Sequence, residues 1–484
     1  MRGAVVTALI LVAAGCAAKV DQPARSFSVE PPTTWSAAPA SVEQATADVD
    51  WWAYFGDAGL DGAIRESLTH NKDLTAAAAR IDLAQAQARV AGAPLLPELS
   101  TSLSRNRQRI NFICLPIPGR EGDVLSSINT NVGLSLNLNW EADVWGKLKA
   151  GQLAALADVE AVQTDLHGAR LSLTGQTAKA WFAAIEAKRQ LQLAQASLES
   201  FQVSAERVRA RFESGVRPSL DLRLALTAVD RAESAVQQRR QILDASVRQL
   251  EILMGKYPAA EYELAEDLPD APRGVPAGLP AELVSRRPDL ISQERRLLAA
   301  DARIAQSKAA LRPSFSLTGA SGTATNQLQD LLSGEVFVWS LIGGLTQPIF
   351  NNGRLKAEVR QSEARAREAA ALYENAALNA YREVEVALAA DRFLSEQETA
   401  LDTATRQAIK AQELAEERYR SGLADIITVL DAQRTAIDSE SQWLAVRRAR
   451  LDNRVDLHLA LGGSFAMDSA SMAVPQPTEV RETL

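Results

Sequence analysis

Few residues of this chain could carry out covalent chemistry. The sequence holds two cysteines and three histidines among 484 residues. The histidines His70, His167 and His458 lie in alanine- and leucine-rich stretches, and Cys114 lies in an apolar run typical of a loop. None of the GxSxG, HExxH or CxxC patterns of common nucleophilic, zinc and redox sites occurs. We therefore expect no enzyme activity, no metal site and no cofactor.

The other cysteine, Cys16, has the context of a lipid-attachment site. A short positive start is followed by the apolar residues 4–14, which are too few to span a bilayer, and small residues precede Cys16. This pattern resembles a bacterial lipobox, in which the leader is removed and the cysteine is lipidated. Plain signal cleavage beside an incidental cysteine is the alternative. We expect lipidation at Cys16, and Ala17 after it favours the outer membrane.

The composition favours long helices over a bulky core, since the chain is 46% hydrophobic but only 5% aromatic. The net charge of −8 argues against a nucleic-acid partner, because such proteins present basic patches. If Cys16 is acylated, Cys114 has no partner for an intrachain disulfide.

A junction between a strand and a helix organises the chain. From Ile128 to Trp140, apolar and polar residues alternate without a break, which predicts a strand with one apolar face and one Asn/Ser face. After Gly146 the pattern becomes Ala- and Leu-rich, and no proline occurs before Pro218. This predicts a helix of about 70 residues, or about 100 Å.

The same order of features occurs twice. Arg211 and Gly215 reappear as Arg418 and Gly422, and the Gly-Lys-Leu-Lys-Ala run at 146–150 reappears at the same offset as Gly-Arg-Leu-Lys-Ala. Residues that mark turns and helix ends do not easily recur at one constant offset by chance. Each repeat therefore reads as helix, strand, strand, very long helix, glycine turn and second helix.

These patterns predict six segments. They are a signal peptide at 1–15, a lipidated tether at 16–56, a first repeat at 57–256, an irregular connector at 257–281, a second repeat at 282–463 and a tail at 464–484. In the first repeat we expect strands at about 98–108 and 127–140, then helices at about 147–213 and 219–254. In the second we expect strands at about 313–322 and 336–349, then helices at about 353–420 and 425–461.

The fold class is mainly α with a small membrane β part. Four strands cannot close a barrel, and open sheet edges are not tolerated in lipid, so strands that cross a membrane need several chains. Three chains would supply a twelve-stranded barrel with its Asn/Ser face toward water. The alternatives are a soluble sandwich for the strands and a solid coiled-coil rod for the helices. Polar residues on every helix face favour a hollow helical barrel.

Several short runs, in their order and duplication, resemble the TolC-type outer-membrane efflux factors. The resemblance is greatest to the lipoprotein (NodT/OprM-like) branch that serves resistance-nodulation-division (RND) pumps. The runs are Cys16 after small residues, Trp51-Trp52, Phe55-Gly56-Asp57, Arg286-Arg287-Pro288-Asp289-Leu290, Pro348-Ile349-Phe350, Gly353-Arg354-Leu355 and the paired Arg-x-x-x-Gly turns.

The resemblance implies a homotrimer whose outer-membrane barrel continues into a periplasmic α-helical tunnel. It implies a passive exit duct that docks onto a periplasmic adaptor and an inner-membrane RND-type pump. Energy would come from the pump, since the chain has no nucleotide-binding loop. The alternatives are an outer-membrane component of type I protein secretion or of metal efflux, and a structural trimeric coiled-coil surface protein.

The resemblance also implies a periplasmic gate. Ile427 and Asp431 match positions that ring a constriction, where three carboxylates would focus negative potential. Tyr419 matches a tyrosine that bonds an aspartate of the neighbouring tip hairpin, and Asp221 matches that aspartate. An arginine latch of some members is Ala424 here, so this part is absent or replaced. The alternative is that both aspartates are solvated residues.

The glycine turns are the expected docking tips. A tight reversal between antiparallel helices favours a residue with positive φ. The residues expected to face the adaptor are Arg211, Gly215, Val216, Arg418, Gly422 and Leu423.

Overall fold

The structure is a computed structural model that describes residues 33–37, 50–112, 125–272 and 286–463. The predicted signal peptide, Cys16, Cys114 and the predicted tail lie outside these ranges. The described residues fall into two compact units. One contains the described residues within 81–161 and 294–372, and the other contains those within 33–80, 162–293 and 373–463.

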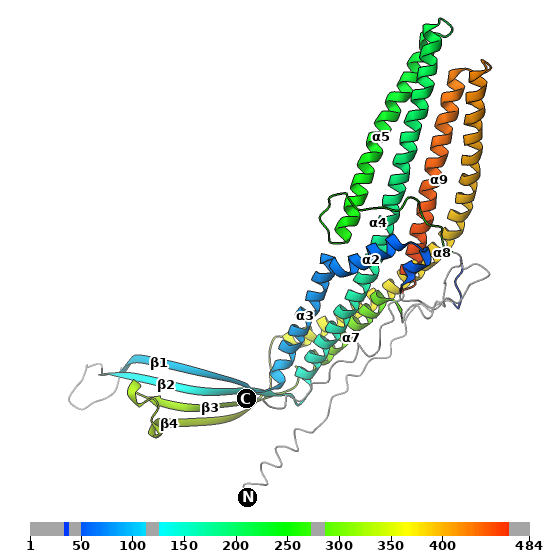
Figure 1. Cartoon of the computed structure of the whole chain (residues 1–484). Coiled ribbons are helices and arrows are strands. Elements are labelled where there is room, and N and C mark those ends of the chain that lie inside the picture. The colour runs from blue at the N-terminus through cyan, green and yellow to red at the C-terminus, as the bar shows by residue number, and fades with distance from the viewer. Residues whose placement is uncertain (1–32, 38–49, 113–124, 273–285, 464–484) are drawn as a thin grey trace. The chain divides into compact units, whose positions relative to one another are not determined.

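The first unit contains a four-stranded antiparallel sheet in the order β1-β2-β3-β4 (Figure 1). Its strands are β1 (Glu98–Phe112), β2 (Leu125–Ala142), β3 (Ser314–Thr325) and β4 (Phe337–Thr346). β1 and β3 run past the expected ends at 108 and 322. β4 stops before the expected 349, where Pro348 offers no N–H to a ladder.

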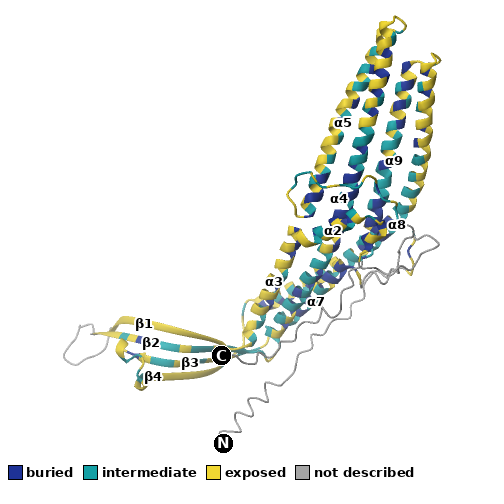
Figure 2. Cartoon of the chain, viewed as in Figure 1, coloured by how far each residue is buried: buried dark blue, intermediate teal, exposed yellow. Residues whose placement is uncertain are grey.

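The register gives this sheet two chemically distinct faces. Leu99 lies opposite Leu138 on one face, while on the other Ser102 lies opposite Ser135, with their Oγ atoms 2.8 Å apart. β1 and β4 are exposed along almost their whole length (Figure 2), and Trp339 is 72% exposed. The sheet therefore leaves an apolar face and two edges uncovered within one chain.

The helices are long and few. They are α2 (Ala58–His70), α3 (Lys72–Gly92), α4 (Lys147–Glu213), α5 (Ser219–Leu253), α7 (Pro288–Ala309), α8 (Arg354–Arg420) and α9 (Ile426–Ala460). α4 and α8 each contain 67 residues, close to the length expected from the sequence. No helix of the described ranges combines the length and hydropathy needed to cross a membrane.

The largest core of the second unit forms where the short helix η1 (Trp51–Phe55) and α2 pack on α4. Trp51, Trp52 and Phe55 are buried there, and Phe55 contacts Phe182 with ring centroids 5.2 Å apart. Away from this cluster, buried positions form narrow stripes on the helices (Figure 2). Thin stripes suit a wall of helices rather than a solid bundle.

Candidate functional site

The α4–α5 and α8–α9 hairpins both reverse at a glycine with positive φ, +73° at Gly215 and +78° at Gly422. At the first turn the Gly215 N–H donates to the Phe212 carbonyl (2.9 Å) and the Val216 N–H donates to the Arg211 carbonyl (2.9 Å). This is a Schellman motif, and the second turn repeats it. Nothing lies within 4 Å of a Cβ built on either glycine, so backbone conformation alone requires glycine here.

The helices that leave the two turns begin differently. The Asp425 carboxylate caps α9, accepting from the Thr428 N–H (2.9 Å) and the Thr428 hydroxyl (2.7 Å). These hydrogen bonds lower the pKa of Asp425 below its ordinary value. α5 begins after Pro218, which offers no side-chain cap. The second tip therefore starts its returning helix with an additional pair of hydrogen bonds.

Arg211 links the two tips. Its guanidinium lies 4.4 Å from the ring centroid of Tyr419 and donates to the carbonyls of Tyr419 (3.1 Å) and Arg420 (3.2 Å). The Arg211 side chain thus makes a cation–π contact and also donates to the last carbonyls of α8. The sequence predicts Arg211 on a surface offered to the adaptor, whereas the structure places its side chain between the hairpins, half-buried.

The predicted hydrogen bond between Tyr419 and Asp221 is not formed. Tyr419 is only 3% exposed, and within the described residues its hydroxyl has no hydrogen-bond partner. Asp221 is buried and instead faces Arg217, with Nη1 and Oδ2 3.9 Å apart. The Arg217 guanidinium also lies 5.8 Å from the Tyr419 ring centroid. Arg217 therefore lies between the two predicted partners, a role that the sequence did not reveal.

An apolar cluster packs the four helices together beside these contacts. Most of its members are alanine, valine or isoleucine, and the Tyr419 ring is its largest side chain. They are Ala205 and Val208 from α4, Ala225 from α5, Ala415 and Tyr419 from α8, and Ile426 and Val429 from α9.

A buried amide adds polar contacts below the cluster. The Gln433 side chain of α9 donates from Nε2 to the hydroxyls of Ser200 (2.9 Å) and Ser204 (3.0 Å), and Glu416 Oε1 lies 3.3 Å away. Separation of α9 from α4 would break these bonds. Because buried amides need partners, such bonds favour one arrangement of the hairpins.

Ile427 and Asp431 lie one helical turn apart on an exposed face of α9. Ile427 is 55% exposed and is not packed into its own chain. Asp431 is exposed and pairs with Arg434, with Oδ1 and Nη2 2.5 Å apart. Arg434 offsets part of the Asp431 charge, and the sequence interpretation did not include it.

The turns themselves expose apolar side chains. Val216 is 69% exposed and Leu423 is 71% exposed. Phe212 and Leu220 flank the first turn and are also exposed, although the sequence interpretation did not select them. Arg418 is exposed beside the second turn. The tips thus carry an apolar surface of the kind that marks docking sites.

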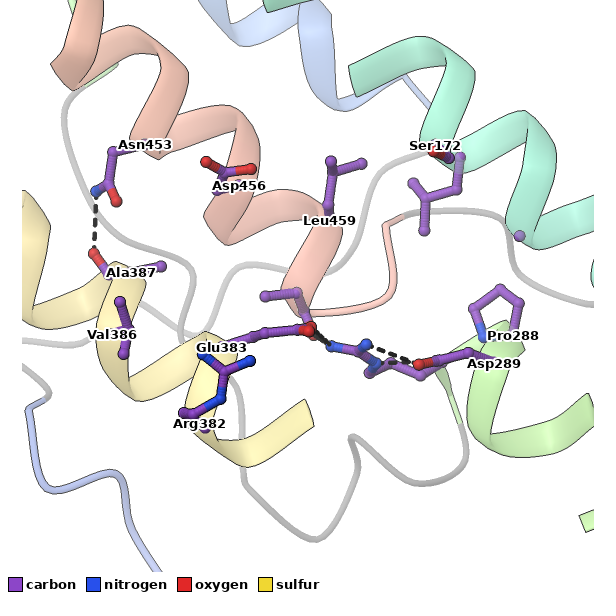
Figure 3. A pocket seen from close by; sticks show the side chains of 14 residues that line it. Ser172, Pro288, Asp289, Arg382, Glu383, Val386, Ala387, Asn453, Asp456 and Leu459 are labelled. Atoms are coloured by element: carbon purple, nitrogen blue, oxygen red, sulfur yellow. Dashed lines mark hydrogen bonds and ion pairs between the residues drawn. The ribbon is translucent and has the colours of Figure 1, made fainter. Parts of the chain in front are cut away.

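A cavity of about 480 Å³ lies among α4, α7, α8 and α9 of the same unit (Figure 3). Arg287 binds both Asp289 oxygens (3.0 and 2.8 Å), Glu383 Oε2 (2.7 Å) and the Ala460 carbonyl (3.1 Å). Burial alone would lower the pKa of Arg287, but contacts with these carboxylates raise it. Its donors are engaged, so Arg287 acts as a clamp between helices.

No group of three or more His, Cys, Asp or Glu side chains suited to a metal ion occurs in the part of the chain that the structure describes. Ile427 and Asp431 lie on an exposed face of α9 close to the second tip.

The chain is similar to known proteins over most of its length. The sequence model of the outer membrane efflux protein family matches residues 63–256 and 279–463. The pyoverdine export outer membrane protein OpmQ of Pseudomonas putida is 33% identical over 465 residues, covering 92% of this chain and 94% of that protein.

Two further matches have the same extent. The outer membrane protein OprJ of Pseudomonas aeruginosa is 33% identical over 469 residues, covering 96% of this chain and 95% of that protein. A crystal structure of the Neisseria gonorrhoeae MtrE outer membrane channel in its open state matches with a TM-score of 0.79 at 26% identity. That match covers 92% of this chain and 98% of the MtrE chain.

Proposed function

The chain belongs to the outer membrane efflux protein family, and from this premise we propose that three copies form one closed duct through the outer membrane. Membership confirms the resemblance to TolC-type efflux factors, the outer-membrane location and the expectation that the chain is not an enzyme. The protein is an efflux channel that serves a pump. The trimer, the gate and the anchor belong to the proposal.

The main support for a trimer is the uncovered sheet of the first unit. Its apolar face is exposed, and β1 and β4 are open edges. Lipid can cover the apolar face, but unpaired backbone groups in lipid are strongly unfavourable. Three sheets joined edge to edge would form a closed barrel of twelve strands with the Asn/Ser face toward water.

The two hairpins would form the periplasmic wall and its closure. In a trimer, three copies of the Ile427–Asp431 face would surround the axis, giving an apolar ring next to a ring of carboxylates. The exposure of this face within one chain supports the assignment. Arg434 beside Asp431 would moderate the preference for cations.

Opening would separate the α8–α9 hairpin from the α4–α5 hairpin. The contacts that would break are the Arg211 bonds to α8, the contact of Arg217 with Tyr419 and the Gln433 bonds to α4. The apolar cluster between the tips is small, so a partner could supply enough binding free energy to shift the equilibrium.

The partners in this proposal are a periplasmic adaptor and an inner-membrane RND-type pump. Val216 and Leu423, with Arg418 beside them, form the surface offered to the adaptor. Exposed apolar residues at a hairpin end favour a docked protein over bulk water.

A lipid at Cys16 would anchor the duct by its N-terminus. The support is indirect and comes from the tether at 33–37, where Trp35 is buried against Val384 and Leu388 of α8. The N–H groups of Ser36 and Ala37 donate to the Glu385 carboxylate at 2.7 and 2.9 Å. Residues 33–37 of the expected tether are thus held on α8.

Complementation tests the proposal. A strain that lacks its own outer-membrane channel but keeps pump and adaptor should recover efflux with this protein. Val216→Asp combined with Leu423→Asp should abolish recovery without loss of the trimer, while Phe393→Asp, at an exposed apolar position of α8 away from the turns, serves as the matched control. Full recovery with the tip variant would contradict the docking assignment.

A further inference from the structure

The apolar face of the sheet changes character at one end of β1. Leu99, Thr101 and Leu103 are followed on the same face by Arg105, Arg107 and Arg109. The pairing register fixes this placement, because the three arginines lie opposite Val132, Thr130 and Ile128 of β2, which belong to the apolar face. Three cations therefore replace the leucines in one straight row.

The row lies on the part of the sheet farthest along the chain from α3 and α4. β3 ends at Thr325, opposite Val132, so Arg107 and Arg109 lie where only β1 and β2 pair. The opposite face of this extension carries neutral polar side chains. They are Asn106 and Gln108 of β1 with Asn129 and Asn131 of β2.

The three guanidinium groups are exposed, and none of them forms an ion pair within the described residues. Their cross-strand neighbours on β2 carry no charge. The row is therefore not neutralised by an ion pair within the described residues, and it presents three positive charges along one line, with neighbours about 7 Å apart.

The sheet's position in a membrane limits where such a row can lie. A cation within hydrocarbon is unfavourable, so these side chains must lie beyond the apolar band. Arg105 follows Leu99 by six residues, or about 20 Å of strand. Phe337 and Trp339 of β4 lie in rows just before it, as aromatic residues do at a membrane interface.

We propose that Arg105, Arg107 and Arg109 bind phosphate groups on lipid headgroups of the outer leaflet. The proposal rests on the proposed function, since it needs the sheet to lie in the outer membrane. Guanidinium forks match phosphate oxygens, and the row faces lipid rather than the water-lined side. Phosphorylated lipids would thereby fix the height of the barrel at its outer end.

The test compares vesicles of phosphatidylcholine alone with vesicles that also contain a bisphosphorylated lipid A. Wild type should bind the vesicles that contain lipid A more tightly. Each arginine should contribute about fivefold to this preference, so replacement of all three by glutamine should remove it. Arg360→Gln with Arg365→Gln and Arg367→Gln removes the same charge from exposed positions on α8 and should keep the preference.

A preference that persists in the triple glutamine variant would overturn the proposal. A second outcome would also overturn the proposal: the triple variant loses the trimer, while Arg109→Gln keeps the wild-type preference. The row would then join protomers rather than bind lipid. If the triple variant does not fold, Arg107→Gln and Arg109→Gln singly should each lower the preference about fivefold. Excess inorganic phosphate should not abolish it. If wild type forms channels in neither kind of vesicle, that result would instead contradict the proposed function.

Discussion

Two half-buried titratable side chains of the second unit have opposite effects on stability. His458 stacks on Trp51 with ring centroids 5.3 Å apart, and burial lowers its pKa to about 4. Asp452 is half-buried beside Arg448, and partial burial raises its pKa to about 6. The histidine favours the folded state at pH values above its unfolded pKa of 6.5. The aspartate favours the folded state at pH values below its unfolded pKa of 3.8.

The histidine can be tested by substitution with an aromatic residue. Acidification from pH 6.5 to 4 protonates His458 in the unfolded chain first, so its contribution is lost over this window, by up to about 3 kcal/mol. His458→Phe keeps a ring against Trp51 without a titrating group. We expect urea unfolding of this variant to lose less stability than wild type between pH 6.5 and 4, because the contribution of the histidine is absent. An equal loss of stability in the two proteins would contradict the assignment.

The aspartate gives the complementary result. At neutral pH the Asp452 carboxylate is charged although burial disfavours it, and one of its oxygens lacks a hydrogen-bond partner among the described residues. Asp452→Asn should stabilise the protein at pH 7 by about 1–2 kcal/mol and have no effect near pH 4. The matched variant Asp456→Asn, at an exposed carboxylate that pairs with Lys179, should not stabilise it. Equal effects of Asp452→Asn at both pH values would refute this.

At the scale of elements, sequence patterns predict regular structure better than contacts between tips. The period-2 alternation at 128–140 and the glycine with positive φ at each turn follow from backbone geometry, which depends on local residues. The position of Arg217 between Asp221 and Tyr419 depends on how two hairpins far apart in sequence approach each other. No local pattern encodes that approach.

The same reasoning explains why the predicted hydrogen bond between Tyr419 and Asp221 is not formed. Tyr419 and Asp221 both lie near Arg217, but a bond between them also requires that no other side chain be inserted. Ala424 suggested that an arginine of the second tip is missing. An arginine of the first tip, Arg217, lies beside Tyr419 instead.

Tyr419 offers a test of this joint. Tyr419→Ala removes the ring that Arg211 and Arg217 face and should loosen the tips, raising single-channel conductance severalfold. Tyr419→Phe should leave conductance unchanged, because the hydroxyl has no partner in the described part of the chain. If both variants raised conductance equally, the hydroxyl would have a partner in another protomer.

At the scale of the whole molecule, the chain carries surfaces that one copy leaves unsatisfied. The sheet has open edges and an exposed apolar face, the α9 face exposes Ile427 beside Asp431, and the turns expose apolar residues. Composition predicts the long helices, and strand count predicts the need for further copies. Sequence cannot show how many helices line the lumen, because thin apolar stripes allow several arrangements.

Single-channel recording in planar bilayers tests the central claim, a trimeric duct closed at its tips, most directly. Wild type should form channels of low conductance. Arg211→Gln combined with Arg217→Gln should raise the conductance severalfold, because it removes the contacts of both arginines with α8. Arg209→Gln, on the same helix but paired with Glu206, should behave as wild type. Absence of channels from wild type, or equal conductance in all three proteins, would contradict the claim.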